Sequence, residues 1–207
     1  DRLYTTAADG LPRRSAQTAM YHIVEAMLRW IAPVLSFTAE EIWVDIPGNH
    51  DKTIFVSTWY EGLTPLDESV EMNSAYWDQL IAVRSAVSKQ LEQLRNDKVI
   101  KGSLTAEVTL YCEDELFNKL NALQDELRFV LITSEATLQS LTEKSDDAIE
   151  SEVEGLWIKA GATEKTKCAR CWHHREEVGQ SAEHPELCQR CVDNIDESGE
   201  GEVRHFA

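Results

Sequence analysis

The sequence predicts a mainly α fold: a helical bundle is followed by a small α/β unit and a terminal four-cysteine zinc knuckle. Three observations support this. Apolar residues recur at helical spacing through most of residues 11–96, they alternate with polar residues at 104–112, and four of the five cysteines lie between residues 168 and 191. Helical spacing indicates amphipathic helices, and alternation indicates a half-buried strand. We therefore expect three units, at residues 1–97, 98–162 and 163–207.

The first helical segment is predicted over residues 11–46. Pro33 should end or kink it, because proline has no backbone N–H to donate. Thr38 and Glu41 have the spacing of a capping box, so a second helix is expected to start there. The apolar stripe of this segment consists of Met20, Ile23, Val24, Met27, Leu28 and Ile31.

Two further segments complete the first unit. Residues 53–60 predict a short, extended and marginally paired β-like run, and residues 65–96 predict a long helix or a helix pair. Antiparallel packing of all these helices gives a bundle over residues 1–97. The apolar face of the long helix is expected to carry Trp77, Leu80, Ile81, Val87, Leu91 and Leu94.

The periodicity changes after Gly102, where apolar and polar residues alternate up to Cys112. This pattern predicts a strand, with Cys112 as a small core residue on its apolar side. Residues 116–131 return to helical spacing, two strands are expected near 135–140 and 153–160, and the polar residues 142–151 should form a loop. The result is a small α/β unit.

The cysteines form two Cys-x-x-Cys pairs, Cys168/Cys171 and Cys188/Cys191, with sixteen residues between them. Two such turns complete a tetrahedral sulfur shell, which leaves no open position for water, so we predict one structural zinc ion. Residues 163–195 contain few apolar side chains, so metal binding should supply their folding free energy.

Other uses of these cysteines stay open at this point. Four thiolates also suit an iron–sulfur centre, whereas redox pairs would need a βαβ context that the sequence lacks here. His173 and His174 are expected to face solvent rather than replace a cysteine as ligands.

The knuckle combines basic side chains with one aromatic ring. Such a surface binds single-stranded RNA through base stacking and phosphate contacts. Alternatively, Trp172 packs over the zinc turn and the cations are solvated; nearby glutamates nearly balance their charge. Spacing alone supports the two interpretations about equally. The basic residues concerned are Lys165, Lys167, Arg170, Arg175 and Arg190.

The overall composition limits the function further. The formal net charge is −17, from 20 basic and 37 acidic residues, which disfavours non-specific nucleic-acid binding. The sequence has no apolar run long enough for a membrane span and no signal peptide, and its cysteine usage indicates a reducing compartment. We expect a cytoplasmic location. The missing Met start leads us to expect a fragment of a larger protein.

Several stretches carry a family resemblance that covers essentially the whole chain. Residues 4–19 and 32–43 resemble the anticodon-binding helical domain of the bacterial isoleucyl-tRNA synthetases. Residues 102–111 and 127–132 are similar to the region that follows it there. The Cys-Ala-Arg-Cys-Trp sequence at 168–172, with Cys188-Gln-Arg-Cys191 and the terminal Arg204-His-Phe-Ala207, is similar to the terminal zinc module and is the most specific part.

The resemblance implies the C-terminal part of a class I aminoacyl-tRNA synthetase. The members of that family are ligases of protein biosynthesis, which charge tRNA(Ile) with isoleucine using ATP. Its His-x-Gly-His and Lys-Met-Ser-Lys-Ser motifs do not occur here, and neither does a Gly-rich phosphate loop. We therefore expect no catalytic residue in this chain, and ATP binding only at a catalytic domain outside it.

The resemblance also implies residue roles. Arg170 and Trp172 flank Cys171 where the family places RNA-contacting groups, and Arg13 and Arg14 are candidates for the backbone of the anticodon stem. The expected partner is tRNA(Ile). No membrane partner is expected, and the chain is expected to be a monomer.

Two other function classes compete with tRNA binding. One is a non-enzymatic zinc-ribbon module that binds protein or DNA, similar to the finger that ends some DNA glycosylases; it would need a different preceding fold and a basic surface. The other is a thiol redox enzyme, which needs exposed cysteines of low pKa.

Overall fold

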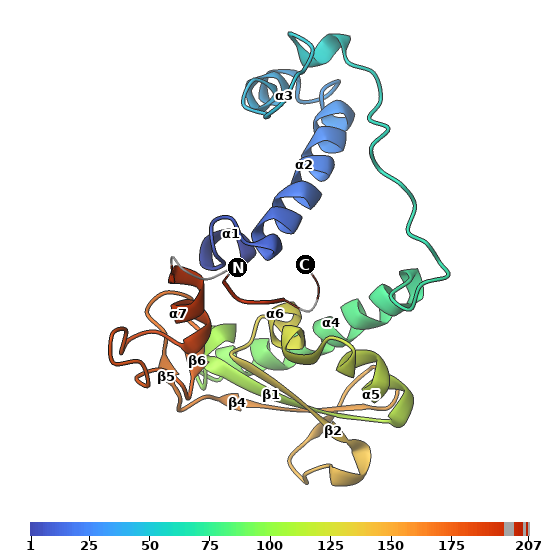
Figure 1. Cartoon of the computed structure of the whole chain (residues 1–207). Helices are drawn as coiled ribbons and strands as arrows, with labels where there is room; N and C mark the ends of the chain where they lie inside the picture. Colours follow the sequence, from blue (N-terminus) through green and yellow to red (C-terminus); the bar gives the residue numbers. More distant parts are fainter. Residues whose placement is uncertain (197–200, 205, 207) are drawn as a thin grey trace.

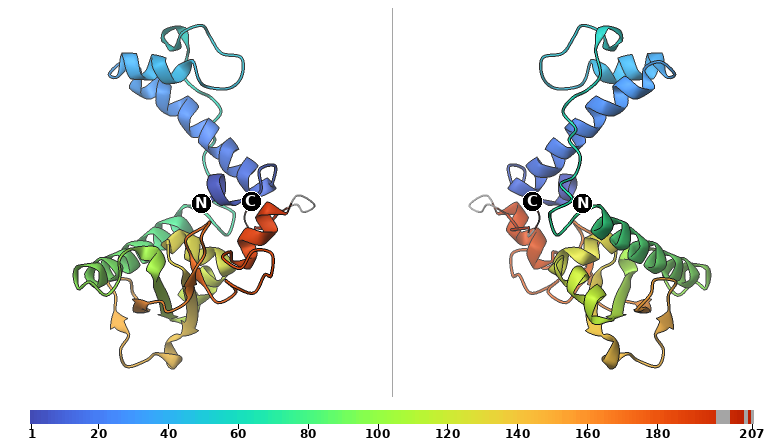
Figure 2. Two further views of the ribbon diagram at one scale, coloured as in Figure 1. Left: turned by 90° about the vertical axis from the view of Figure 1, so that its left-hand side faces the viewer. Right: turned by 90° about the vertical axis from the view of Figure 1, so that its right-hand side faces the viewer.

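The computed structural model describes residues 1–196, 201–204 and 206. A helical arm extends from a mixed α/β body, and the cysteine knuckle lies at the base of the arm (Figure 1). Figure 2 shows from two sides that α1 and the start of α2 lie beside α7, whereas α3 lies at the far end of the arm. The fold therefore combines helices, a small mixed sheet and a cysteine cluster. Within the described residues, no helix is long and apolar enough to cross a bilayer.

The arm consists of α1 (Arg2–Thr5), α2 (Leu11–Ile31) and α3 (Ser36–Trp43). Pro12 lies in the first turn of α2, where its missing N–H costs nothing. The helix ends two residues before Pro33, as predicted, because Pro33 has no backbone N–H with which to continue the helical hydrogen bonds. Ala32, directly before it, still has helical angles of φ −52° and ψ −40°.

The predicted capping box at Thr38 and Glu41 is wrong. The turn after α2 stays hydrogen bonded, with Leu35 N–H donating to the Ile31 carbonyl at 2.7 Å. A new helix therefore starts directly from this turn at Ser36, with no side-chain cap. Thr38 and Glu41 consequently lie within α3 rather than at its start.

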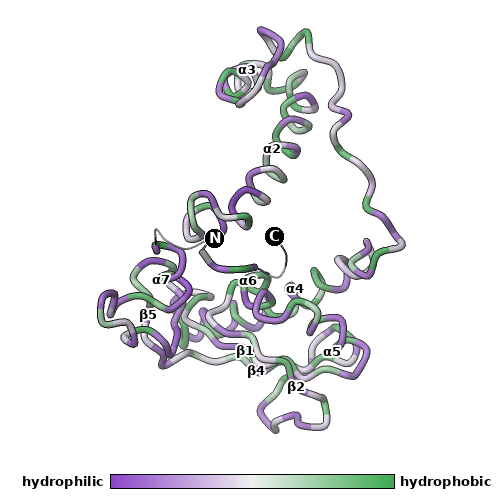
Figure 3. The backbone as a smooth tube through the Cα atoms, in the orientation of Figure 1, coloured by the Kyte–Doolittle hydropathy of each residue, from purple (hydrophilic) through white to green (hydrophobic). Residues whose placement is uncertain are grey.

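The arm has a small core of its own, and only part of the predicted apolar stripe faces it. Leu28 is buried there, whereas Met20, Ile23 and Met27 are about half exposed. Apolar residues recur along the second half of α2, toward α3 (Figure 3), so this part of the helix has more apolar surface than the core covers. The buried members of the core are Leu28, Ala32, Ala39, Trp43 and Ile54.

The predicted β-like run at 53–60 is also wrong. Ile54–Val56 form a short 3₁₀ helix, η1, and no described strand pairs with this segment. The Glu40 carboxylate accepts hydrogen bonds from Thr53 Oγ1 at 2.9 Å and Ile54 N–H at 3.0 Å, which binds the segment to α3. The chain then continues as an irregular connection to the body (Figure 1).

Helix α4 (Ser74–Asn96) begins later than predicted, because the Asn73 side chain caps it by accepting from Tyr76 N–H. The antiparallel bundle is wrong as well: α4 packs on the sheet, and the arm keeps a separate core. Helical periodicity identifies an apolar face but not the element that covers it. Of the predicted face, Ile81 stays 58% exposed. The proposed division into units 1–97, 98–162 and 163–207 remains a prediction, although packing groups α4 with the sheet.

The sheet has the strand order β2-β1-β4-β3. Strand β1 (Ala106–Cys112) is parallel to β2 (Glu135–Ser140) and antiparallel to β4 (Leu156–Ala162). The strands near 135–140 and 153–160 are thus confirmed, whereas the two-residue β3 (Ile149–Glu150) lies in the segment expected to be a loop.

Helices complete the core of the body. Between β1 and β2 the chain forms α5 (Asp114–Asn121), the short η3 (Gln124–Glu126) and α6 (Leu127–Leu131), and together with α4 these lie over one face of the sheet (Figure 1). Two further 3₁₀ turns are η2 (Ser103–Thr105) and η4 (Leu141–Glu143). Cys112 is fully buried, which confirms its place in the core. Burial raises the pKa of its thiol to about 12.

Candidate metal centre

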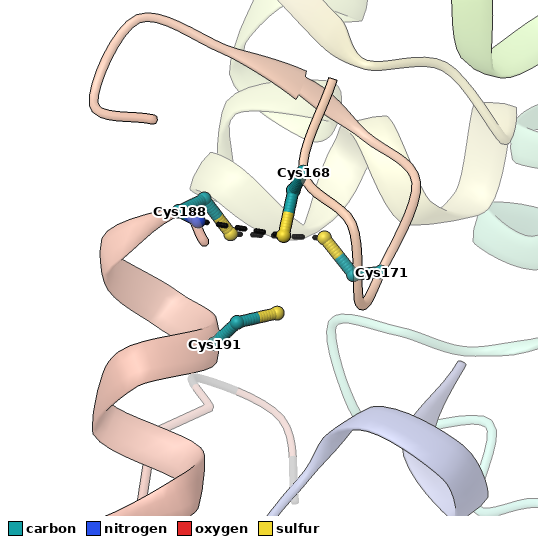
Figure 4. Close-up of side chains that lie close together, drawn as sticks. All are labelled: Cys168, Cys171, Cys188 and Cys191. Carbon is teal, nitrogen blue, oxygen red and sulfur yellow. Dashed lines mark hydrogen bonds between the residues drawn. The ribbon is translucent and has the colours of Figure 1, made fainter. Parts of the chain in front are cut away.

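The four cysteine sulfurs converge on one point (Figure 4). All four side chains are buried, and their sulfurs lie within 4.8 Å of one another. A tetrahedral zinc ion with Zn–S bonds of about 2.3 Å places its sulfurs about 3.8 Å apart, and the sulfurs of Cys171 and Cys188 are 3.6 Å apart. None of the cysteines is in a disulfide. The arrangement therefore has the size of a metal shell.

Local backbone structure aims the sulfurs at this point. Cys168 and Cys171 lie on the turn between the two-residue strands β5 (Thr166–Lys167) and β6 (His174–Arg175). The turn closes through the Cys168 N–H, which donates to the His173 carbonyl at 2.9 Å. Trp172 has φ +66°, a left-handed conformation that costs an ordinary residue roughly 1–2 kcal/mol. The turn therefore depends on the contacts around it.

The second pair of sulfurs comes from helix α7 (Gln189–Ile195). Cys188 is its N-cap residue and Cys191 lies in its first turn. The Cys188 N–H donates to the sulfur of Cys168 at 3.4 Å, which joins the two pairs. Hydrogen bonding from Cys188 and Cys191 lowers the pKa of Cys171. Because the thiolate is the form that binds metal, the cluster favours ionisation of this member.

The described part of the knuckle has few apolar contacts. Apart from the cysteines, its buried apolar residues are limited to Leu187, with Val178 and Val192 packed partly against the cluster. Burial of three aliphatic side chains stabilises a fold by only about 1.5–3 kcal/mol each. This supports the expectation that metal binding stabilises the segment.

The predicted RNA-contacting residues on the knuckle lie at its surface. The Trp172 side chain is 61% exposed, so it does not pack over the zinc turn. The Lys167 ammonium lies 5.0 Å from the centre of its ring, within cation–π range. Arg170 is half exposed, and its Nη1 donates to the Thr5 carbonyl and lies 3.8 Å from the Cys191 sulfur.

Most of the other knuckle cations are engaged within the fold. Lys165 pairs with Glu135 at 2.6 Å, and Arg175 pairs with Glu177 at 3.1 Å. Arg190 binds the Asp1 carboxylate at 3.0 Å. The broad basic surface suggested by the sequence therefore narrows to Lys167 and Arg170 beside the exposed Trp172.

The expectation that His173 faces solvent is wrong, since its side chain is only 4% exposed. Its ring packs edge-on against Phe129 at 5.4 Å, and its Nδ1 lies 3.2 Å from Arg128 Nη1. Burial, followed by the nearby Arg128 charge, lowers the pKa of His173 to about 4. His174 is half buried, and its Nδ1–H donates to the Lys165 carbonyl at 2.7 Å. Neither histidine belongs to the group of convergent ligand atoms.

The two arginines predicted on the arm lie in the first turn of α2, where Arg13 is half buried and Arg14 is exposed. The base of the arm reaches the knuckle through the Ala7 N–H, which donates to Asn194 Oδ1 at 2.9 Å. The four predicted RNA contacts therefore come from two elements, the start of α2 and the cysteine turn.

A group of charged residues joins the ends of the described chain, and no pattern in the sequence predicts it. The Asp1 carboxylate accepts from Arg190 and, at 2.6 Å, from Arg204. Three guanidinium groups surround the Phe129 ring: those of Arg204, Arg128 and Arg190, at 3.7, 4.0 and 4.9 Å from its centre. No local spacing signal indicates such long-range pairs.

Two family models match the chain: an anticodon-binding domain of tRNA ligase over residues 1–110, and a zinc finger found in FPG and IleRS over residues 166–194. The chain is 56% identical over 206 residues to an isoleucine–tRNA ligase of Methylococcus capsulatus, and 54% identical over 207 residues to that of Stutzerimonas stutzeri. Each alignment covers 100% of this chain and 22% of the relative. The chain thus spans about a fifth of the length of these relatives.

The zinc-finger match and the four convergent sulfurs together support one structural zinc ion as the cofactor of this module. Both cysteine pairs are buried, whereas a redox enzyme needs an accessible thiol. The thiol redox alternative is therefore wrong, and the zinc-finger match favours zinc over iron.

Proposed function

Because the chain belongs to the family of tRNA-ligase anticodon-binding domains, we propose that it binds the anticodon stem and loop of tRNA(Ile) as the C-terminal part of an isoleucine–tRNA ligase. The observation that carries this proposal is the direct contact between the two matched modules: Arg170 of the knuckle holds the Thr5 carbonyl at the base of the arm. One RNA hairpin can therefore touch both modules at once.

In this proposal the chain binds RNA and leaves the chemistry to the rest of the ligase. Joining isoleucine to tRNA with ATP would take place in a catalytic domain outside this chain, which itself contributes no catalytic residue. Binding of the anticodon hairpin would orient the distant acceptor end, and such positioning lowers the barrier of a reaction by fixing its geometry.

Each proposed contact follows from exposure and charge. Trp172 is the most exposed aromatic side chain of the knuckle and would stack on a base of the loop. Arg170 uses one nitrogen to hold Thr5, and its guanidinium has further donors for a phosphate. Arg13 and Arg14 would contact the backbone of the stem from the start of α2.

We propose Cys168, Cys171, Cys188 and Cys191 as the four thiolate ligands of the zinc ion. All four are buried and their sulfurs converge, so a closed shell would leave no position for water or substrate. The ion would act only by holding the turn and α7 together, which places Arg170 and Trp172 for RNA.

We further propose that the chain works in the cytoplasm and as a monomer. A zinc-ribbon role in protein or DNA binding has no specific observation in its favour, because the arm and α4 match the anticodon-binding domain of a tRNA ligase.

Binding of two RNA hairpins tests the proposal. The first carries the tRNA(Ile) anticodon loop, and the second has the same stem with a scrambled loop; affinity is measured at several salt concentrations. We expect tighter binding of the authentic loop at every salt concentration. Equal affinities would contradict anticodon recognition and leave only charge attraction, which fades with salt.

A further inference from the structure

A groove of about 350 Å³ lies on the body, between helix α4 and the side of strand β4 that faces away from β1. Its size falls within the range of about 300–1,000 Å³ that ligand sites occupy. Neither the cysteines nor the residues proposed to contact RNA line it. Ile149 of β3 borders the groove and is 60% exposed. The other apolar lining residues are Ala86, Leu94, Ile158 and Ala160.

Strand β4 has an outer edge that its neighbour covers only in part. Strand β1 pairs with the whole of β4, whereas β3 pairs only with Trp157 and Ile158. If β3 continued in the same register, Asp147 would lie opposite Ala160. The chain instead forms a turn over residues 145–148, closed by a main-chain hydrogen bond of 3.1 Å. Beyond Ile158, no described strand therefore covers β4 on this side.

This edge presents main-chain groups to the groove. Successive residues of an antiparallel strand direct their N–H and C=O groups to opposite edges. The Gly155 carbonyl accepts a hydrogen bond from the residue after β1, and the Leu156 carbonyl accepts one from the residue after β3, so the even-numbered residues of β4 point outward. Among the residues that the structure describes, nothing pairs with the outward groups of Ala160 and Ala162. Such an edge is a template for a further strand.

The charged residues around the groove favour a cationic ligand. Three carboxylates line it, those of Asp147, Glu150 and Glu152, together with the ammonium of Lys89. Glu152 pairs with Lys89 at 3.0 Å, and Asp147 pairs with Lys159 at 2.9 Å. Glu150 is exposed and forms no ion pair with a described residue. An open strand edge, an apolar hollow beside a helix and an acidic lining together match an extended peptide with aliphatic and basic side chains.

We propose that this groove binds an extended, basic segment of another protein, which adds to the outer edge of β4 as an antiparallel strand. The segment follows the line along which β3 would continue. Its residue opposite Ala160 points to the same face of the sheet, toward α4, so an aliphatic side chain there fills the hollow beside Ala86. Basic side chains two positions away face the carboxylates. This inference goes beyond tRNA binding and does not depend on it.

Binding of three synthetic peptides to the full 207-residue chain tests the proposal. The first is the blocked peptide Thr-Lys-Thr-Leu-Thr-Lys-Thr, whose threonines favour an extended chain. The second carries a methyl group on the main-chain nitrogen of leucine, and the third has glutamate in place of both lysines. The N-methylated peptide should bind about tenfold more weakly or worse, because it lacks the N–H that pairs with Ala160. In NMR spectra, the first peptide should protect the Ala160 amide from exchange.

Variants of the protein test the charge and the edge separately. Glu150→Lys should weaken the lysine peptide and strengthen the glutamate peptide, each by about two- to fivefold at low salt, as exposed ion pairs do. Glu154→Lys makes the same change of charge at an exposed residue outside the groove and should alter neither. Ala160→Pro removes only an outward N–H, which an edge position tolerates, and should abolish binding. Circular dichroism verifies folding, and Glu150→Lys decides alone if the proline variant does not fold.

Several results would overturn the proposal. One is no binding of the lysine peptide at millimolar concentration, which would leave a solvated strand edge. Another is equal binding of the N-methylated peptide, or an equal effect of Glu154→Lys, since either would show attraction by charge alone. A peptide that binds this chain but not the complete isoleucine–tRNA ligase would show that the ligase itself covers the edge. None of these results bears on recognition of the RNA hairpins.

Discussion

Arg170 of the knuckle donates a hydrogen bond to the main-chain carbonyl of Thr5 in α1, and the same nitrogen lies 3.8 Å from the sulfur of Cys191. One side chain therefore connects the cysteine cluster to the base of the arm, across 165 positions of sequence. This contact relates the metal centre to the RNA-binding role, because it makes the position of the arm depend on an ordered knuckle.

Replacement of Arg170 by Ala should loosen the arm from the knuckle. A hydrogen bond that involves a charged group contributes about 1.5–3 kcal/mol, so we expect faster amide hydrogen exchange in α1 and weaker binding of the anticodon hairpin. Arg170→Lys keeps the charge but has a different geometry and should restore only part of the protection. Unchanged exchange in α1 for Arg170→Ala would show that the contact does not hold the arm.

Removal of the metal should unfold residues 163–195 and leave the α/β body intact. Zinc contributes about 10–16 kcal/mol to the folding of small zinc modules, and the apolar contacts of this knuckle are few. After a chelator is added, the amide NMR signals of the knuckle should lose their dispersion, while those of α4 and β1 should persist. Cys188→Ser should have the same effect without a chelator. A knuckle that keeps its signals without metal would contradict the structural role of zinc.

The five cysteines should react with a thiol reagent in three stages. Zinc protects the four knuckle thiols, and burial protects Cys112, whose pKa is raised to about 12. We expect almost no labelling of the loaded protein at pH 8, four labels after chelation and five after denaturation. Early labelling of Cys112 in the loaded protein would contradict its place in the core.

The raised pKa of Cys112 also predicts a pH effect on stability. In the unfolded chain the thiol loses its proton near pH 8.5, whereas in the folded core it stays protonated up to about pH 12. The folded state then holds the extra proton, so the contribution of this thiol to stability is complete below pH 8.5 and falls as the pH rises above it. Urea titrations should show that the free energy of unfolding falls less from pH 7 to pH 10 for Cys112→Ala than for the unchanged protein, because the variant lacks this thiol.

Trp172→Ala should weaken hairpin binding by about 1–3 kcal/mol, the contribution of one base–aromatic stack. Because the side chain is 61% exposed, the variant should keep its zinc content and its thermal stability. A matched change at the half-buried Trp157 on β4 should lower stability rather than affinity. Loss of zinc from Trp172→Ala would instead identify the ring as a structural part of the knuckle.

The parts of the fold that local pattern determines were predictable from the sequence. Strand β1 alternates, and its Cys112 lies in the core as expected. The two cysteine pairs converge because each Cys-x-x-Cys turn already points two sulfurs the same way. The end of α2 before Pro33 follows from the missing backbone N–H of proline.

The parts that depend on distant partners were not predictable. The apolar face of α4 fits a sheet as well as a helix bundle, and nothing in its spacing indicates which one covers it. His173 is buried because Phe129 and Arg128, more than 40 positions away, pack on it. Arg170 reaches the Thr5 carbonyl only because α1 lies against the knuckle, and the sequence does not show this.

Binding of the authentic and scrambled anticodon hairpins to the same preparation with zinc, after chelation and after zinc is restored tests the central claim most directly. We expect the zinc-loaded chain to prefer the authentic loop, the chelated chain to lose that preference, and restored zinc to recover it. A preference that survives chelation, or no preference in the loaded chain, would contradict the claim that zinc orders a surface for the anticodon loop.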